Sequence, residues 1–106
     1  MFSKKQRIER EKIGNIIKNP DFSFSNGFLN IKYSINNLSI RRFSIIIPKK
    51  VEKSAVKRHF LKRKIINWIS MSNLDIGYDF VFYIKNKSII DNKKMFDSLL
   101  EKCIID

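Results

Sequence analysis

Residues 49–64, KKVEKSAVKRHFLKRK, decide how this chain is organised. The stretch holds eight of the 22 Lys and Arg residues and a single acid, Glu52. It follows Pro48, which cannot donate a hydrogen bond to a β-ladder and therefore ends the β-rich run before it. Apolar residues then recur at the spacing of one helix face, at Leu61, Ile65, Trp68 and Ile69. The stretch therefore predicts a long helix over 54–69 that begins in a dense cluster of positive charge.

Upstream of this helix, the sequence predicts one helix and two strands. Residues 3–18 carry a ragged apolar stripe at helical spacing, which predicts a first helix. Residues 28–35 and 40–47 alternate between apolar and polar side chains, the pattern of half-buried strands. Because only a short turn at Asn36-Asn37 separates them, we expect these two strands to pair as an antiparallel hairpin.

Downstream, the sequence predicts one more strand and a final helix. Residues 79–85, DFVFYIK, form a strongly apolar run, and Asp91 is placed to cap a last helix. A further short strand near residue 22 is compatible with the pattern. The order α-β-β-α-β-α, with that extra strand left open, predicts an α+β fold. We expect a single-domain α-β sandwich over residues 1–106, with helices packed on one sheet.

Length and composition restrict the class of protein. A chain of 106 residues has the size of one domain, and no apolar run approaches the roughly 20 residues that cross a bilayer. The charged N-terminus is unlike a signal peptide. Cys103 lies at helical spacing with apolar neighbours, so we interpret it as a core residue and expect a reducing, cytoplasmic environment. One cysteine and one histidine supply too few ligands for a zinc site.

The positive charge is concentrated in one part of the chain. The net charge is +12, and residues 22–74 hold eleven Lys and Arg against one acid. A concentrated basic field beside aromatic residues predicts a polyanionic partner, most simply a nucleic acid. The alternative is that many lysines reflect the composition of an AT-rich genome, because the chain is also rich in Ile, Asn and Phe.

The predicted long helix divides its cations between several directions. Arg58 and Lys62 lie toward one edge of its apolar stripe, and Lys57 and Lys64 lie toward the other. Two further basic side chains, His59 and Arg63, point away from the core. Phe60 also falls on the outward side of the helix. It either stacks on a base or packs under a neighbouring loop.

The sequence contains no convincing catalytic constellation. Its carboxylates are scattered, and His59 has no evident nucleophile beside it. Three glycines are too few and too dispersed for a phosphate-binding loop. The chain is therefore interpreted as a binding protein whose helix neutralises several phosphates at once.

Residues 49–66, KKVEKSAVKRHFLKRKII, resemble the signature of the protein subunit of bacterial-type ribonuclease P. In that family a strand ends in a KK pair, and a helix then opens with the pattern AVxRNRxKRxxR. The positions that match in order are Ala55, Val56, Arg58, Lys62 and Arg63, after the pair Lys49-Lys50. The sequence departs from the family pattern at His59 for Asn, Phe60 for Arg and Ile66 for Arg.

The resemblance implies a fold with a left-handed βαβ crossover around the long basic helix, against the usual right-handed rule. It implies removal of the 5′ leader from precursor tRNA, with catalysis by a separate RNA subunit that binds most of the Mg²⁺. The protein would be a monomer when free, would join one RNA molecule, and would supply no catalytic or metal-binding residue. The partners would be ribonuclease P RNA and precursor tRNA, with no membrane.

The resemblance also implies two sets of contact residues. The set that binds RNA comprises Lys49, Lys50, Lys53, Lys57, Arg58, His59, Lys62, Arg63 and Lys64. The set that lies near the substrate leader, in a cleft between the first helix and the central strands, comprises Ile13, Ile17, Tyr33 and Arg42. Two alternatives remain open at this point: a generic RNA-binding protein of ribosomal type, and a structural or protein-interaction domain.

Overall fold

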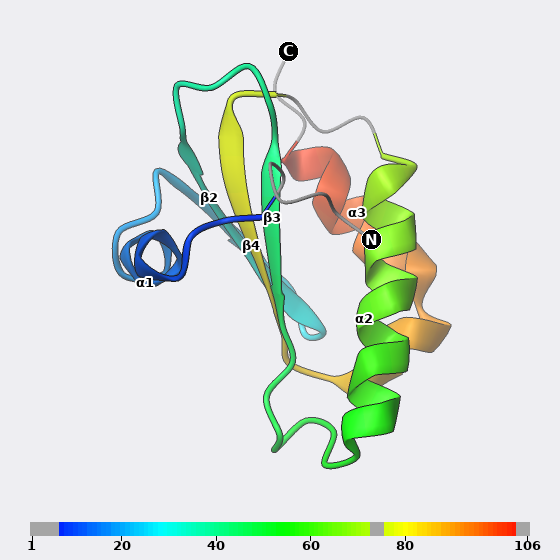
Figure 1. The fold of residues 1–106 in the computed structure, drawn as a ribbon. Coiled ribbons are helices and arrows are strands. Elements are labelled where there is room, and N and C mark those ends of the chain that lie inside the picture. The colour runs from blue at the N-terminus through cyan, green and yellow to red at the C-terminus, as the bar shows by residue number, and fades with distance from the viewer. Residues whose placement is uncertain (1–6, 73–75, 104–106) are drawn as a thin grey trace.

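A computed structural model describes residues 7–72 and 76–103 of the chain. Its elements are α1 (Arg10–Lys18), β1 (Phe22–Ser25), β2 (Leu29–Ile35), β3 (Arg42–Ile46), α2 (Ala55–Ser70), β4 (Tyr78–Ile84), the 3₁₀ helix η2 (Lys87–Asp91) and α3 (Lys93–Lys102) (Figure 1). The predicted α+β order is confirmed, and β1 is the extra strand near residue 22.

The four strands form one mixed sheet in the order β1-β2-β4-β3. The expected hairpin between β2 and β3 is wrong, because β4 lies between them, antiparallel to β2 and parallel to β3. The reason is burial: four consecutive residues of β4 are buried, from Asp79 to Phe82. A strand that is apolar on both faces belongs in the middle of a sheet that is covered on both sides. The alternation of apolar and polar side chains in β2 and β3 did not reveal which strand pairs with each of them.

Helix α2 connects the parallel strands β3 and β4. The chain runs down β3, up α2 and down β4, which lies behind β3 in Figure 1. This path makes the βαβ crossover left-handed, as the sequence resemblance implied. The loop that follows β3 and the first turn of α2 therefore meet at one end of the molecule, where the basic stretch 49–64 is concentrated.

Helices cover both faces of the sheet. On one face, α2 and α3 bury the large core with the odd residues of β2 and the even residues of β4. On the other face, α1 packs Ile16 against Val81 of β4. Cys103 is fully buried in the large core, which confirms its interpretation as a core residue. Burial raises the pKa of its thiol to about 12, so the sulfur stays protonated near neutral pH.

Two helix boundaries differ from the predictions. Helix α1 begins at Arg10 rather than at residue 3, and residues 3–6 lie outside the described part. Arg7 instead forms a parallel bridge with Phe43, so this segment uses its backbone groups to extend the sheet. Asp91 does not cap the last helix, because it ends the 3₁₀ helix η2, and Asn92 precedes α3. The Asn86 side chain accepts a hydrogen bond from Ser88 N and so starts that extra turn.

A buried ion pair joins β3 to β4. Arg42 and Asp79 face each other in the strand register, and the guanidinium donates from Nε at 2.7 Å and from Nη2 at 2.6 Å to the two carboxylate oxygens. Asn36 Nδ2 donates a further hydrogen bond to Asp79 Oδ1 at 2.8 Å. Both side chains are over 90% buried, at 8% and 6% exposed. The hydrogen bond to Asp79 raises the pKa of Arg42, so its guanidinium is charged at every ordinary pH.

We predict that Asp79→Ala lowers the free energy of unfolding by about 3–5 kcal/mol, because it leaves the Arg42 cation buried without its partner. Urea denaturation followed by circular dichroism measures the loss. The matched control is Asp97→Ala, whose ion pair with Lys93 is 2.8 Å long but about half exposed. That control is expected to lose no more than about 0.5 kcal/mol. Equal losses in the two variants would contradict the assignment of the Arg42–Asp79 pair as a structural element.

Candidate RNA-binding surface

A tight turn presents the first lysines of the basic stretch. The backbone N–H groups of Val51 and Glu52 both donate to the carbonyl of Pro48, at 3.0 and 3.3 Å. This turn leaves Lys49 and Lys50 exposed at its tip. The end of β3 thus places two cations at the mouth of the crossover, where proline has already ended strand pairing.

Two side chains fix the path from this turn into α2. Ser54 is the N-cap, and its hydroxyl accepts a hydrogen bond from Lys57 N at 3.2 Å. Arg58 reaches back and donates from Nη1 to the carbonyl oxygens of Glu52 and Lys53, both at 3.0 Å. Arg58 is therefore half-buried and holds the loop against the helix. We assign it a positioning role, which differs from that of its exposed neighbours.

Glu52, the single acid of the stretch, is engaged within the protein. Its Oε1 accepts a hydrogen bond from Ser54 N at 3.1 Å, and its Oε2 lies 3.7 Å from Lys87 Nζ. The backbone hydrogen bond from Ser54, with Lys87 and Lys57 nearby, lowers the pKa of Glu52 below its ordinary value. The carboxylate thus stabilises the start of α2 while Lys87 offsets its charge.

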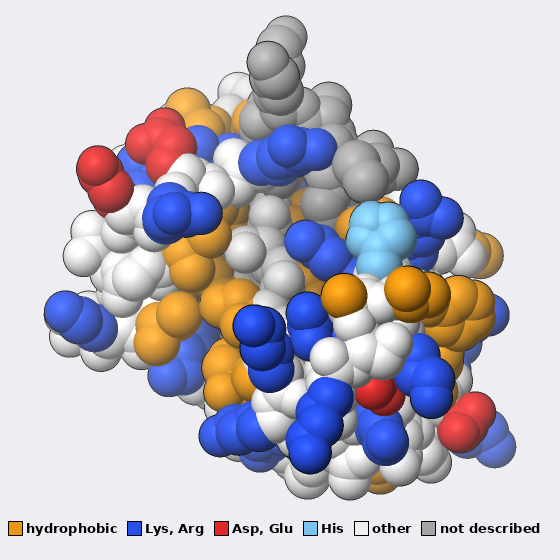
Figure 2. Space-filling view, turned by 60° about the horizontal axis from the view of Figure 1, so that its bottom comes forward, with side chains coloured by type: hydrophobic (Ala, Val, Ile, Leu, Met, Phe, Trp, Pro, Cys, Tyr) orange, Lys and Arg blue, Asp and Glu red, His pale blue; other side chains and the backbone are white. Residues whose placement is uncertain are grey.

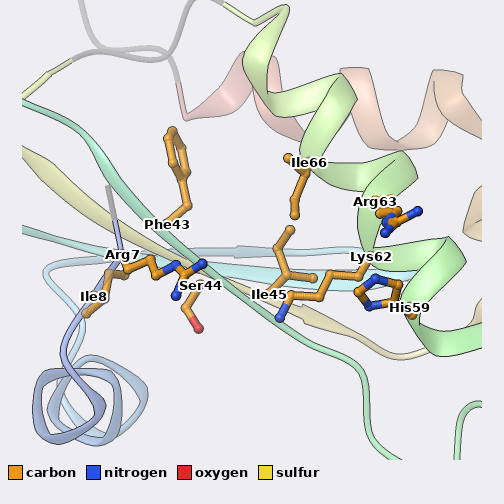
Figure 3. Close-up of a pocket in the computed structure, with 9 residues that line it drawn as sticks. All are labelled: Arg7, Ile8, Phe43, Ser44, Ile45, His59, Lys62, Arg63 and Ile66. Atoms are coloured by element: carbon orange, nitrogen blue, oxygen red, sulfur yellow. The ribbon is translucent and has the colours of Figure 1, made fainter. Parts of the chain in front are cut away.

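A groove runs along the outer edge of β3. Its walls are the segment at Arg7 and Ile8 on one side and α2 on the other, and its volume is about 300 Å³. Figure 3 shows Ile45 and Ile66 pointing toward each other across its floor, and Arg7 beside Ser44. The rim on α2 carries His59, Lys62 and Arg63. A second hollow of about 260 Å³ shares His59 and Lys62 and extends the groove toward Arg58.

The remaining cations of α2 lie on its outward surface. Figure 2 shows Lys and Arg side chains gathered over the end of the molecule that holds this loop and helix, with few acidic side chains between them. Helix α2 contains no acid. Its exposed Lys and Arg residues are Lys57, Lys62, Arg63 and Lys64, and Lys53 precedes them in the loop. The geometry suits an extended polyanion that crosses both the groove and the helix.

A comparison with protein families identifies the family of the chain. The family model for ribonuclease P matches residues 2–105, which is nearly the whole chain. The chain belongs to the ribonuclease P protein family. It is a protein component of ribonuclease P, whose role is in tRNA processing. No curated protein sequence matches the chain.

Solved structures of ribonuclease P proteins share the fold. The protein from Thermotoga maritima superposes with a TM-score of 0.73 at 20% sequence identity, covering 88% of this chain and 94% of that chain. The protein from Staphylococcus aureus gives a TM-score of 0.70 at 21% identity, covering 92% of this chain and 91% of that one. At such low identity these matches establish the fold, including the sheet that carries the basic crossover.

The structure brings together the nine residues expected to contact RNA. All lie in the loop after β3 or on α2, and all except Arg58 are exposed. Their spacing along the chain was sufficient to place them on one surface, because one loop and one helix hold them all. Sequence reasoning missed Arg7 and Ile8, which form the opposite wall of the groove. Their alternating charged and apolar character was a weak strand signal within a predicted helix.

The structure separates the four residues expected near the substrate leader of ribonuclease P. Ile17 is 38% exposed and lines a hollow of about 200 Å³ with Lys32 and Tyr83. Ile13 is half-buried and packs against the small core between α1 and the sheet. Tyr33 is 1% exposed and packs in the core on the opposite face of the sheet. Its expected place in the cleft is therefore wrong, since β2 turns its odd residues toward α2 and α3. Arg42 is on the α1 side of the sheet, but its guanidinium is hydrogen-bonded to Asp79.

Tyr83 and Lys32 line the hollow beside α1 together with Ile17, and the sequence analysis did not select them. Tyr83 is on the face of β4 that carries Val81, and Lys32 is on the corresponding face of β2. Lys32 Nζ also donates to the carbonyl of Ile17 at 3.1 Å, which ties α1 to the sheet. Its position could have identified Tyr83, because residues two apart in a strand share a face and Val81 faces α1.

The side chains that commonly bind metal ions are dispersed over the described residues. Those residues contain no group of three or more His, Cys, Asp or Glu side chains close enough to hold a metal ion together. Nor does any helix in the described ranges have the length and apolar character needed to cross a membrane.

We predict that Arg58→Ala costs about 1.5–3 kcal/mol of folding stability, because it removes charge-assisted hydrogen bonds to two loop carbonyls. Lys62→Ala, one turn along the same helix, is expected to change stability by less than about 0.5 kcal/mol. Lys62→Ala should instead weaken RNA binding and reduce the slope of log K against log salt by about one. Urea denaturation and anisotropy titrations over a salt series separate the two roles. Equal stabilities would contradict the positioning role of Arg58.

The pH dependence of stability tests the assignment of Glu52. Its folded pKa lies below its ordinary value of 4.5, so its contribution is fully present above 4.5 and is lost as the pH falls through the folded pKa. We predict that the wild type is more stable than Glu52→Gln at pH 6. This difference in stability should disappear as the pH falls below the folded pKa of Glu52. Paired urea titrations at several pH values measure the difference. A difference that persists unchanged in acid would contradict the prediction.

Proposed function

We propose that this protein binds the RNA subunit of ribonuclease P through its basic loop and α2, and contacts the 5′ leader of precursor tRNA on the α1 side of the sheet. The observation that carries the proposal is the groove along β3, which has an apolar floor and a cationic rim. A rim of this kind neutralises phosphates, whereas the apolar floor accommodates sugars or bases. The stoichiometry that we propose is one protein per RNA.

The proposed contacts to the RNA subunit come from exposed cations. Lys62 and Arg63 flank the groove, Lys57 and Lys64 extend the surface across α2, and Lys49 and Lys50 extend it into the loop. Arg58 orders this surface from within by its bonds to the loop carbonyls. Each phosphate contact of this kind adds affinity that falls steeply with salt.

The proposed leader contacts are Ile17, Lys32 and Tyr83, which share one hollow beside α1. An exposed apolar side chain, an aromatic ring and an ammonium group together suit a single-stranded nucleotide. Arg42 supports this region by holding Asp79 and the strand register rather than by touching the leader. This proposal replaces Tyr33, which is buried in the core, with Tyr83.

We propose that the RNA subunit performs the hydrolysis. Cleavage of a phosphodiester by bound magnesium needs several oxygen ligands around the metal, and the described residues bring no such group of carboxylates together. The Mg²⁺ ligands would therefore come mainly from RNA. The protein would act by binding both RNA chains and screening their repulsion, and we place this action in the cytoplasm.

Cleavage of precursor tRNA at limiting Mg²⁺ tests the proposal. A bacterial ribonuclease P RNA is assayed with and without the protein, and we expect stimulated cleavage at the mature 5′ end. Lys62→Ala combined with Arg63→Ala should abolish most of the stimulation and reduce the salt slope of RNA binding by about two, because two phosphate contacts are lost.

The control for charge is Lys94→Ala combined with Lys102→Ala. It removes an equal number of positive charges from α3, outside the loop and α2, and should leave the stimulation unchanged. If the two double variants behave alike, net charge rather than the α2 surface determines activity. Binding without stimulated cleavage would contradict the proposed role in the reaction.

A further inference from the structure

Two apolar side chains are exposed in the first two turns of the cationic helix α2. Phe60 is 60% exposed and Val56 is 80% exposed. They are four residues apart, so they lie next to each other on one face of the helix. Leu61 and Ile65, which begin the buried face, are 3% and 0% exposed. Of the two interpretations that the sequence left open, packing under a neighbouring loop is therefore wrong for the described part of the chain.

The surroundings of Phe60 are cationic. Lys57, Arg63 and Lys64 are three or four residues away on the helix, so their Cβ atoms lie about 5–6 Å from that of Phe60, and all three are exposed. Helix α2 contributes no acid. Within the described residues, Phe60 has no partner among the close aromatic ring contacts, all of which lie elsewhere in the molecule.

We propose that Phe60 is a stacking platform for one unpaired base of the bound RNA, with Val56 supporting the adjacent sugar. This inference rests on the proposed function, because it assumes that α2 binds RNA. It adds a specific role: the helix distinguishes unpaired from paired segments, which phosphate contacts alone do not do. Lysines around the ring would neutralise the phosphates on either side of the stacked base.

Charge and shape favour a base over a protein partner. The core of a protein interface is depleted in charged residues, yet every polar neighbour of Phe60 named above is a cation that association would have to desolvate. A base in a single strand presents an aromatic face and carries phosphates on both sides. Both features match a ring that is set among ammonium and guanidinium groups.

The test compares three RNA probes of about 12 nucleotides: a single strand, the same strand with abasic residues at its centre, and the corresponding duplex. Fluorescence anisotropy at constant salt gives the dissociation constants. We expect Phe60→Ala to weaken binding of the intact single strand by about 5- to 150-fold, the range for one stacked base. Binding of the abasic strand and of the duplex should change by less than about twofold.

Two further substitutions separate stacking from apolar burial. Phe60→Leu keeps an apolar side chain but no ring, and should lose about as much affinity as Phe60→Ala. Phe60→Trp should retain affinity, and the fluorescence of the introduced indole should be quenched by the single strand and not by the abasic strand. The native Trp68 is buried at 7% exposure, so it gives a constant background. The matched control is Met71→Ala, which removes a 75% exposed apolar side chain at the far end of α2 and should change nothing.

The outcomes distinguish this inference from the proposed function. If the wild-type protein binds all three probes and stimulates cleavage of precursor tRNA, but Phe60→Ala affects the probes equally or not at all, the stacking role is wrong and the proposed function stands. Wild-type affinity in Phe60→Leu would likewise overturn stacking. If the wild-type protein binds no probe and does not stimulate cleavage, both proposals are wrong.

Discussion

The parallel pairing of β3 with β4 is the constraint on which the rest of this structure depends. Two neighbouring parallel strands require a connection that returns along the full length of the sheet, and α2 supplies it. The buried pair of Arg42 and Asp79 sits within this pairing. A slip of one residue in register would turn every side chain of the strand to the other face and leave both charges buried and unpaired. The ion pair therefore makes the register specific.

The crossover also creates the surface that we propose binds RNA. Because α2 must return beside β3, the basic loop and the first turns of the helix meet at the edge of that strand, and the segment at Arg7 closes the groove from the other side. Within this surface the cations have different tasks. Arg58 donates inward to loop carbonyls, whereas Lys62 and Arg63 remain available to phosphate. One short basic stretch thus contains both the residue that supports the surface and the proposed contacts to RNA.

Sequence patterns were reliable for the type and the faces of single elements, although not for the start of α1 or of α3. The amphipathic spacing of α2 placed Leu61 and Ile65 in the core and five of the six predicted contact residues of the helix in solvent. Patterns failed where two elements had to be compared. The alternation of β2 identified its two faces correctly, but not which face α1 covers, so Tyr33 was assigned to the wrong side. Tyr83 was overlooked because a strand that is buried on both faces shows no alternation.

By itself, the sequence determined the types and order of the elements, the apolar and cationic faces of α2, and the resemblance to the ribonuclease P family, because each depends on local spacing along the chain. Only the tertiary structure decided that β4 lies between β2 and β3, that Arg42 is occupied by Asp79, and that Arg7 faces Lys62 across a groove. Those features depend on which sheet edges pair and which faces are covered. The pairing of edges and the covering of faces depend on burial and charge pairing between residues far apart in the sequence. Local periodicity along the chain does not reveal these contacts.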